Sequence, residues 1–385
     1  MNFRRPMPTF YEFFAGGGMA RAALTRSGWR CLFANDFDAK KVESYVENWG
    51  DQEIRHGDVG KLTSSDLPEH ADLVWASFPC QDLSLAGGGA GLLGNRSGTF
   101  WPFWKLIKQL GAEGRAPTTV VLENVCGTLT SHGGKDFRAI CSALVSEGYL
   151  VGALVMDAAH FVPQSRPRLF VVGTRQSPEN LSAYIESQPQ LPWHTKALVT
   201  AYDGLSPEIQ QRWAWWNLPA PTKRKLNFSD IVEKSSNELK WHSVDETQRL
   251  LDMMSPINRK KIANARATRK LCVGTVYRRT RVEAGVKVQR AEVRFDEVAG
   301  CLRTPAGGSS RQILLFVERG ETRSRLISAR ETARLMGLSE QYELPKRYND
   351  AYHLTGDGVA VPVVEYLSQN LLHQTLDPET EKKVA

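Results

Sequence analysis

Short apolar runs alternate with amphipathic stretches over the first part of the chain. A continuous apolar run bounded by turn-forming residues is typical of a parallel strand that is buried on both faces. Such runs predict strands that begin near residue 9 and occupy 31–36, 73–76, 119–125, 149–158 and the end of 160–175. Amphipathic stretches predict helices at 100–110 and 137–149. This alternation indicates an α/β fold with a doubly wound, mostly parallel sheet.

The pattern changes near residue 186, where the chain becomes rich in proline and tryptophan and loses its regular periodicity. Helical periodicity returns at 327–338, and a glycine turn with an amphipathic helix occupies 355–372. A length of 385 residues fits two domains, or one large domain with an insertion. We predict a first domain over 1–185, a smaller irregular domain over 186–325, and a segment over 326–385 that returns to the first domain.

Composition restricts the class of protein. Hydrophobic residues make up 42% of the chain, mean hydropathy is -0.35, and no run of about 18 uncharged apolar residues is present, so no membrane span is expected. The N-terminus lacks the apolar core of a secretory signal, and the six cysteines form no C-x-x-C pair. These features predict a reduced, cytoplasmic protein without a metal site. A net charge of +7 permits a polyanionic partner but does not require one.

A glycine turn and two acids follow the first predicted strands. Gly16 and Gly18 belong to a turn in which the backbone can approach a ligand closely. Asp36 ends the second predicted strand, where an acid can accept hydrogen bonds from both ribose hydroxyls. Phe37 is suited to stack on an adenine, and Asp58 to accept from its amino group. Each feature alone is most often structural, but their order favours an adenosine cofactor.

Cys80 is a candidate nucleophile. It follows the predicted strand at 73–76 and the rigid Pro79, at the strand end where open α/β sheets bind their ligands. A lone cysteine is more often a small buried apolar group, so the assignment depends on its neighbours. Glu123 ends the strand at 119–125 on the same edge, where partial burial is expected to raise its pKa.

Three further stretches suggest contacts with a substrate. The glycine-rich stretch 87–98 is predicted to close over a substrate, although an ordinary linker has a similar composition. Arg166 and Arg168 alternate along an extended stretch, so we expect them to share a face and to hold a phosphate or a substrate carbonyl. Between 259 and 290 basic residues greatly outnumber acidic ones. Such a run is often only a solvated face, but the interleaved aromatic residues favour a nucleic-acid surface.

Six motifs together resemble those of the DNA cytosine-5 methyltransferase family, in particular its bacterial restriction-modification members. They are FAGGGMARAAL (14–24), FPCQDLS (78–84), ENV (123–125), QSRPR (164–168), RLISARETARLMGL (325–338) and GDGVAVPVVEYL (356–367). The resemblance covers nearly everything outside 186–290, and FPCQ, ENV and QSRPR together are highly specific. It implies a Rossmann-like fold that uses S-adenosylmethionine, with 186–325 as the target-recognition domain.

The resemblance implies a role for each matching residue. Cys80 would attack carbon 6 of cytosine, and Glu123 would protonate nitrogen 3. Asn124 would brace the turn at Pro79, while Arg166 and Arg168 would orient the base and the nucleophile. Cofactor contacts are implied for Phe14, Ala15, Gly16, Gly18, Asp36, Phe37, Asp58, Val59, Pro79, Phe100, Asp357 and Val359. DNA contacts are predicted for Gln81, Ser84, Lys260, Lys261, Arg278, Arg279 and Arg303.

Three positions depart from the family pattern. Asp357 stands where asparagine is usual, Cys301 where threonine is usual, and Ser97 where a basic residue is common. An extra carboxylate at Asp357 could re-tune cofactor binding, and Cys301 lacks a hydroxyl suited to a phosphate. None of the three belongs to the central chemistry, so the resemblance stands.

The implied reaction transfers a methyl group from S-adenosylmethionine to carbon 5 of a flipped-out cytosine in a specific duplex DNA sequence, through a covalent Cys80 adduct. The implied partners are double-stranded DNA and, functionally, a restriction endonuclease; the chain is expected to act as a monomer. The alternatives are a tRNA cytosine-5 methyltransferase and a catalytically silent DNA-binding relative. A nicotinamide oxidoreductase is a much less favoured alternative, because the FPCQ and ENV motifs would then have no role in the reaction. Periodicity does not predict the target sequence.

Overall fold

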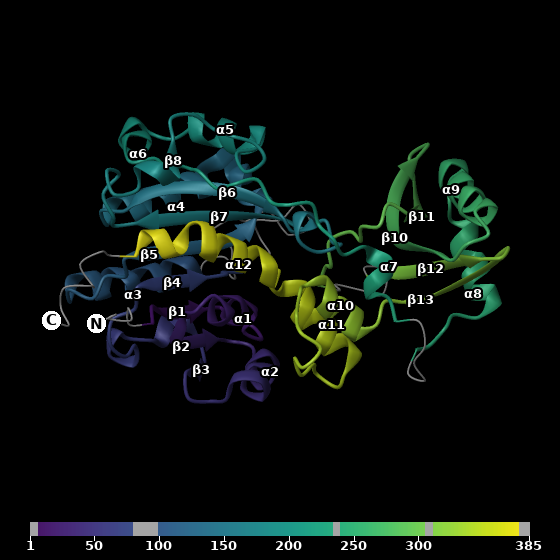
Figure 1. Ribbon diagram of the computed structural model, residues 1–385, viewed down its shortest axis with the longest axis horizontal. Helices are drawn as coiled ribbons and strands as arrows, with labels where there is room; N and C mark the ends of the chain where they lie inside the picture. Colours follow the sequence, from purple (N-terminus) through teal and green to yellow (C-terminus); the bar gives the residue numbers. More distant parts are fainter. Residues whose placement is uncertain (1–6, 80–98, 234–238, 305–310, 377–385) are drawn as a thin grey trace. The chain divides into compact units, whose positions relative to one another are not determined.

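The computed structural model describes residues 7–79, 99–233, 239–304 and 311–376, which belong to two compact units (Figure 1). The first unit comprises Met1–Asp157, Pro167–Pro221 and Val359–Ala385, and the second comprises Ala158–Arg166 and Thr222–Gly358. Residues 186–221 therefore lie in the first unit and 326–358 in the second, which differs from the division expected at 185/186 and 325/326. The assignment of target recognition to 186–325 stays a prediction.

The first unit is built on a seven-stranded sheet with the order β3-β2-β1-β4-β5-β7-β6. Neighbouring strands are parallel except for β7, which is antiparallel to both β5 and β6. The strands are β1 Thr9–Phe13, β2 Arg30–Asp36, β3 Ile54–His56, β4 Leu73–Ala76, β5 Thr119–Val125, β6 Leu150–Asp157 and β7 Pro167–Thr174. The predicted doubly wound, mostly parallel sheet is confirmed. The order reverses between β1 and β4, and ligands bind at such a switch point.

Helices flank this sheet and complete its core (Figure 1). The apolar residues Phe103, Trp104 and Ile107 of α3 are buried in the same core as Val74 of β4 and Val120 of β5. The helices are α1 Met19–Arg26, α2 Ala39–Trp49, α3 Phe100–Ala112, α4 Lys135–Ser146, α5 Lys196–Asp203, α6 Pro207–Gln211 and α12 Val361–Asn370. Two short strands, β8 Ile185–Glu186 and β9 Trp215–Trp216, pair separately.

The C-terminal helix α12 packs against α1, near the start of the chain. The indole Nε1 of Trp29 donates a buried hydrogen bond to Ser368 Oγ at 2.8 Å. The ring of His373 lies 5.1 Å from the Trp29 ring, centroid to centroid. The part of 326–385 that returns to the first unit is thus the part after Gly358.

The second unit contains an antiparallel sheet of four strands with the order β11-β10-β12-β13. The strands are β10 Cys272–Glu283, β11 Val286–Arg294, β12 Ile313–Glu318 and β13 Glu321–Leu326, and the helices are α7 Phe228–Ile231, α8 Val244–Asp252, α9 Pro256–Ala267, α10 Ala329–Leu335 and α11 Tyr348–Asp357. Leu250, Ile262, Val276 and Leu315 share its core. The sequence predicted a smaller irregular domain, and the structure shows a smaller domain that contains a regular four-stranded sheet.

The part of the chain that the structure describes contains neither a membrane-spanning helix nor a cluster of metal-binding side chains. None of their helices combines the length and the apolar character needed to cross a membrane. Within the same residues, no group of three or more histidine, cysteine, aspartate and glutamate side chains is placed to hold a metal ion.

Candidate active site

The glycine turn follows β1 at the switch point of the sheet. Phe14 and Gly16 both have left-handed backbone conformations, with φ of 57° and 56°. The N–H of Gly16 donates to Asp36 Oδ2 at 2.7 Å, which ties the turn to the end of β2. The fold itself requires glycine at position 18, because a Cβ there would lie only 2.4 Å from Trp49 Nε1. Its predicted contact with a cofactor, like that of Ala15, stays a prediction.

Asp36 is held as an acceptor at the end of β2. Each carboxylate oxygen accepts one backbone N–H, from Gly16 at 2.7 Å and from Asp38 at 2.8 Å, and the side chain is nearly buried. Burial raises the pKa of Asp36 above its ordinary value, although Lys41 and the two N–H donors oppose this effect. A carboxylate oxygen has a second lone pair, so each oxygen can still accept from a hydroxyl. These two acceptor oxygens fit the two hydroxyls of a ribose.

Aromatic and apolar side chains surround the same edge of the sheet. Phe37 is 75% exposed directly after Asp36, and His56 Nε2 contacts its carbonyl oxygen at 3.0 Å. Phe100, in contrast, is completely buried and packs on Phe78, with ring centroids 5.3 Å apart. Phe37 is therefore available to stack on a ligand, whereas Phe100 supports the chain that leads into Pro79.

Asp58 and Val59 lie after β3. Asp58 is exposed and caps the short 3-10 helix Val59–Lys61 by accepting from Gly60 N–H at 2.8 Å. Val59 is buried in the core of the first unit. The local fold therefore explains both residues, and their contacts with an adenine stay predictions.

Glu123 and Arg168 form an ion pair near the end of β5. Register places Val125 of β5 opposite Arg168 of β7, and Arg168 Nε lies 3.3 Å from Glu123 Oε1. Only 9% of the Glu123 side chain and 15% of the Arg168 side chain are exposed. A neighbouring guanidinium favours a charged carboxylate, which opposes the effect of burial on which the expected protonation of Glu123 depended. The expected protonation of Glu123 stays a prediction.

Asn124 connects β5 to the chain that leads to the candidate nucleophile. Its Nδ2 donates to the carbonyl oxygen of Phe78 at 3.2 Å, and its Oδ1 accepts from Val125 N–H at 2.8 Å. Phe78 and Asn124 are both buried. The residue before Pro79 is thus fixed to the strand that carries Glu123. The predicted residues Cys80, Gln81 and Ser84, the stretch 87–98 and Ser97 within it lie outside the described residues.

Arg166 has different partners from Arg168, although the alternation of the sequence suggested a shared face. It is 2% exposed in the second unit, and its guanidinium donates to three backbone carbonyls. These belong to Leu302 at 3.0 Å, Gly356 at 2.8 Å and Gly358 at 2.7 Å. Backbone carbonyls take these donors, and the expectation that Arg166 holds a phosphate or a substrate carbonyl stays a prediction. A catalytic role for it stays a prediction.

Two of the positions that depart from the family pattern have clear local partners. Cys301 Sγ lies 3.3 Å from Arg166 NH1, so the thiol belongs to the contacts of that guanidinium. Asp357 ends α11 and accepts a hydrogen bond from the Thr304 hydroxyl. Val359, the next predicted cofactor residue along the chain, is buried and begins the last segment of the first unit.

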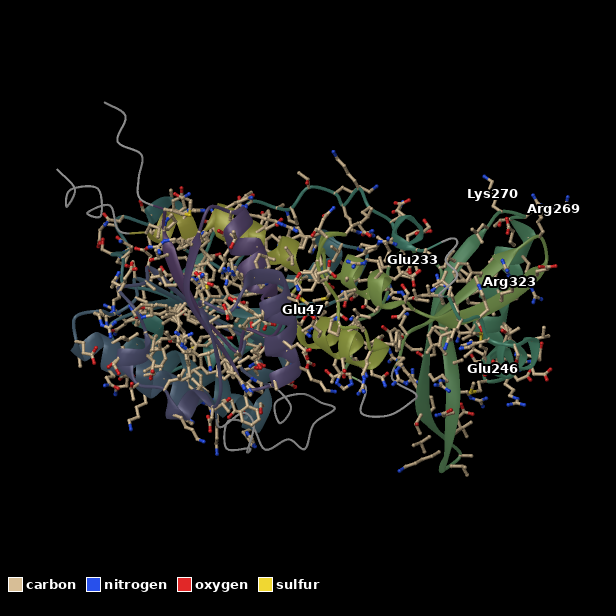
Figure 2. The ribbon with its side chains drawn as sticks, turned by 90° about the horizontal axis from the view of Figure 1, so that it is seen from below. Glu47, Glu233, Glu246, Arg269, Lys270 and Arg323 are labelled. Carbon is tan, nitrogen blue, oxygen red and sulfur yellow. The ribbon has the colours of Figure 1, made fainter. Side chains whose placement is uncertain are left out.

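The basic stretch is less one-sided than its sequence suggested. Arg279 and Arg281 both pair with Glu292, which lies just beyond 290, and Arg290 pairs with Glu283. Lys261 Nζ donates to the carbonyl oxygen of Val293 at 2.9 Å. Basic residues that stay exposed include Lys260, Arg269, Lys270, Lys287 and Arg303. Figure 2 shows Arg269 and Lys270 at an outer corner of the second unit, and contact of any of these residues with DNA stays a prediction.

Glu12 is a residue that the sequence analysis missed. It is 1% exposed in β1, and Oε1 accepts from Arg21 N–H at 3.2 Å. In the described part of the chain, Oε2 has no hydrogen-bond partner. Burial raises the pKa of Glu12 to about 8, so the group is largely protonated at neutral pH. The signal was present in the sequence, as one acid within an apolar strand.

A family model described as C-5 cytosine-specific DNA methylase matches residues 8–373. Among curated relatives, Type II methyltransferase M.BsuFI of Bacillus subtilis is 25% identical, over 97% of this chain and 74% of its own. Type II methyltransferase M.HpaII of Haemophilus parainfluenzae is 24% identical, over 95% of this chain and 89% of its own.

Solved structures resemble the fold. The S. pombe Dnmt2 methyltransferase has a TM-score of 0.57 at 17% identity, and covers 95% of this chain and 98% of its own. A putative DNA modification methyltransferase encoded within an E. coli prophage has a TM-score of 0.55 at 15% identity, and covers 95% of this chain and 99% of its own. At these identities the likeness extends to the fold alone.

Proposed function

This chain belongs to the C-5 cytosine-specific DNA methylase family, and we propose that it methylates carbon 5 of a flipped-out cytosine in a specific duplex sequence, with S-adenosylmethionine as the methyl donor. The relatives named as Type II methyltransferases support a role in restriction-modification. In that role methylation protects host DNA from a partner endonuclease. The proposal includes that the protein acts in the cytoplasm as a monomer and that its substrate is double-stranded DNA.

The observation that carries the proposal is the coupling of Asn124 and Glu123 to the chain that leads into Pro79. Asn124 donates to Phe78, two residues before Cys80, and Glu123 lies next to Asn124 in an ion pair with Arg168. A nucleophile and an acid that act on one ring must be held in fixed register, because small misplacements cost large factors in rate. The hydrogen bond of Asn124 supports the proposal, because it fixes the chain before Pro79 to the strand that carries Glu123.

The proposed chemistry uses the residues of this edge in sequence. The Cys80 thiolate adds to carbon 6 of cytosine while Glu123 donates a proton to nitrogen 3, which leaves carbon 5 nucleophilic. Asp36 and Phe37 would hold S-adenosylmethionine, whose sulfonium would supply the methyl group to carbon 5 and leave as the neutral thioether. Removal of the carbon 5 proton by a base then expels the thiolate and restores the aromatic ring, and nitrogen 3 returns its proton to Glu123. The ring is out of reach within a duplex, so the base must leave the stack at a cost of a few kcal/mol.

The first test is methyl transfer, measured with labelled S-adenosylmethionine on duplex DNA and on tRNA, and mapped by chemical discrimination of methylated cytosines. We expect label at carbon 5 of cytosine in DNA. Label only in tRNA would favour the tRNA alternative, and binding of DNA without any label would favour the silent relative.

The second test asks which cysteine adds to the ring. A duplex with 5-fluorocytosine at the target should form a denaturant-resistant adduct, because fluorine cannot leave as a cation. Cys80→Ala should form none, whereas Cys126→Ser should still form it. Burial raises the pKa of Cys126 to about 11, so its thiol stays neutral. An adduct on the Cys126 peptide would refute the assignment of Cys80.

A further inference from the structure

The β10–β11 hairpin extends beyond the sheet of the second unit as a two-stranded ribbon. β12 pairs with β10 only over Cys272–Val276, whereas β10 continues to pair with β11 up to Glu283. Residues 277–291 therefore form a ribbon, here called the distal ribbon. Its two strands pair with each other, and only Ala291, at its base, has a further bridge, to Met254. The turn at Ala284 and Gly285 has positive φ at both residues, which gives a narrow two-residue tip. Figure 2 shows the hairpin reaching past the other strands of its unit.

Alternation divides the distal ribbon into two faces with different charge balance. One face, the paired face, carries Arg279, Arg281 and Glu283 of β10 and Arg290 of β11. Its charges are neutralised within the hairpin, because Arg279 and Arg281 pair with Glu292 and Arg290 pairs with Glu283. Three arginines and two glutamates thus hold one another in place, and this face has few donors left for a ligand.

The opposite face, the open face, presents side chains that the hairpin does not use. Register places Thr280 opposite Gln289 and Val282 opposite Lys287, and all four residues are exposed. Among the described residues, no hydrogen bond or ion pair of the Thr280, Gln289 or Lys287 side chain is found. Val282 is 69% exposed near the tip of the ribbon. Exposure of an apolar side chain to water is unfavourable, and such exposure often marks an interaction site. Toward its tip the open face therefore combines an amide, a hydroxyl, an ammonium and a methyl surface, and the half-buried Arg278 lies on the same face nearer the sheet.

These groups and the shape of the ribbon match the major groove of duplex DNA. The groove is about 12 Å wide and admits a two-stranded ribbon. Strands lie about 4.8 Å apart, and the seven residues from 277 to 283 span about 23 Å at about 3.3 Å per residue. The side-chain types also match: glutamine pairs with adenine, lysine with guanine, threonine with either, and an apolar side chain with the thymine methyl.

We propose that the distal ribbon enters the major groove and that its open face reads base edges of the target, with Gln289 and Thr280 as specificity-determining residues. This inference rests on the proposed function, since it requires a duplex substrate. The paired face provides rigidity to the ribbon and contributes little to the choice of sequence.

The test compares matched variants of the two faces. The target is first mapped with the wild-type protein, and kcat/KM is then measured on that duplex and on duplexes with single base-pair replacements. Gln289→Ala and Thr280→Ala should each lower discrimination at one base pair by roughly 5- to 150-fold, the range of one good side-chain contact to a base. The control is the double variant Glu283→Ala/Arg290→Ala, adjacent in the ribbon and unchanged in net charge, which should keep the wild-type preference.

The outcomes separate this inference from the function on which it rests. Unchanged discrimination in both open-face variants, with methylation intact, would overturn the reading role of the ribbon and leave the proposed function standing. An equal loss in the paired-face control would also overturn it, because the effect would then follow from ribbon rigidity. If the wild-type protein methylates no duplex, the proposed function itself fails before any variant is compared.

Discussion

Replacing Glu12 by glutamine is predicted to stabilise the first unit by an amount that grows with pH. Burial raises the pKa of Glu12 from 4.5 to about 8. Between these values the unfolded chain has lost the proton that the folded unit retains, so folding must take up a proton. The stabilising contribution of the protonated group is complete below pH 4.5 and is lost as the pH rises toward 8. Glutamine has nearly the same size, keeps an acceptor for Arg21 N–H and does not ionise.

The magnitude follows from the two pKa values. The difference of about 3.5 units corresponds to about 5 kcal/mol, which is reached only above pH 8. At pH 7 the penalty is the part between 4.5 and 7, or about 3 kcal/mol, and at pH 5 it is below about 1 kcal/mol. Glu12→Gln should therefore exceed the wild type by about 3 kcal/mol in free energy of unfolding at pH 7, and by little at pH 5.

The assay is urea unfolding of both proteins from pH 5 to pH 8, followed by tryptophan fluorescence. Glu47→Gln is the control, because this carboxylate is exposed on α2 (Figure 2) and its loss should change stability by less than about 0.5 kcal/mol. A difference between Glu12→Gln and the wild type that does not change with pH would refute the reasoning. It would mean that Glu12 stays ionised, or that its burial is relieved in solution.

Two further predictions concern the ligands of the enzyme. Asp36→Ala should raise the dissociation constant for S-adenosylmethionine, measured by calorimetry, while that for DNA hardly moves; normal cofactor binding would exclude the ribose contact. Lys260→Ala should lower the salt slope of DNA binding by about 0.9, the contribution of one phosphate contact. Lys261→Ala should lower it less, because its ammonium already donates to Val293, and equal effects on the slope would contradict this distinction.

The sheet and its edge could be predicted from sequence because both depend on local patterns. Continuous apolar runs such as 73–76 and 119–122 favour buried strands, and an acid that follows such a run is expected near the strand end. Asp36 and Glu123 were found in this way, and the structure places both near the ends of their strands.

The partners of charged groups could not be predicted, because they depend on register and on distant segments. Arg166 donates to carbonyls 136 to 192 residues away along the chain. Glu292 neutralises arginines of β10 only because the hairpin turns at Ala284 and Gly285. When the strands pair, Glu283 and Glu292 therefore neutralise part of the positive charge of 259–290.

The packing of α12 on α1 also determines when the first unit can fold during synthesis. Trp29 must wait for Ser368, its hydrogen-bond partner, which is 339 residues later in the chain. At roughly 5–20 residues per second, that wait lasts about 20 to 70 s on the ribosome. Over this time the apolar surface of α1 that α12 will cover remains exposed, while the second unit is translated and can fold. The N-terminal unit of this protein is therefore the last to be completed, and the exposed apolar surface of its nascent form favours aggregation until α12 arrives.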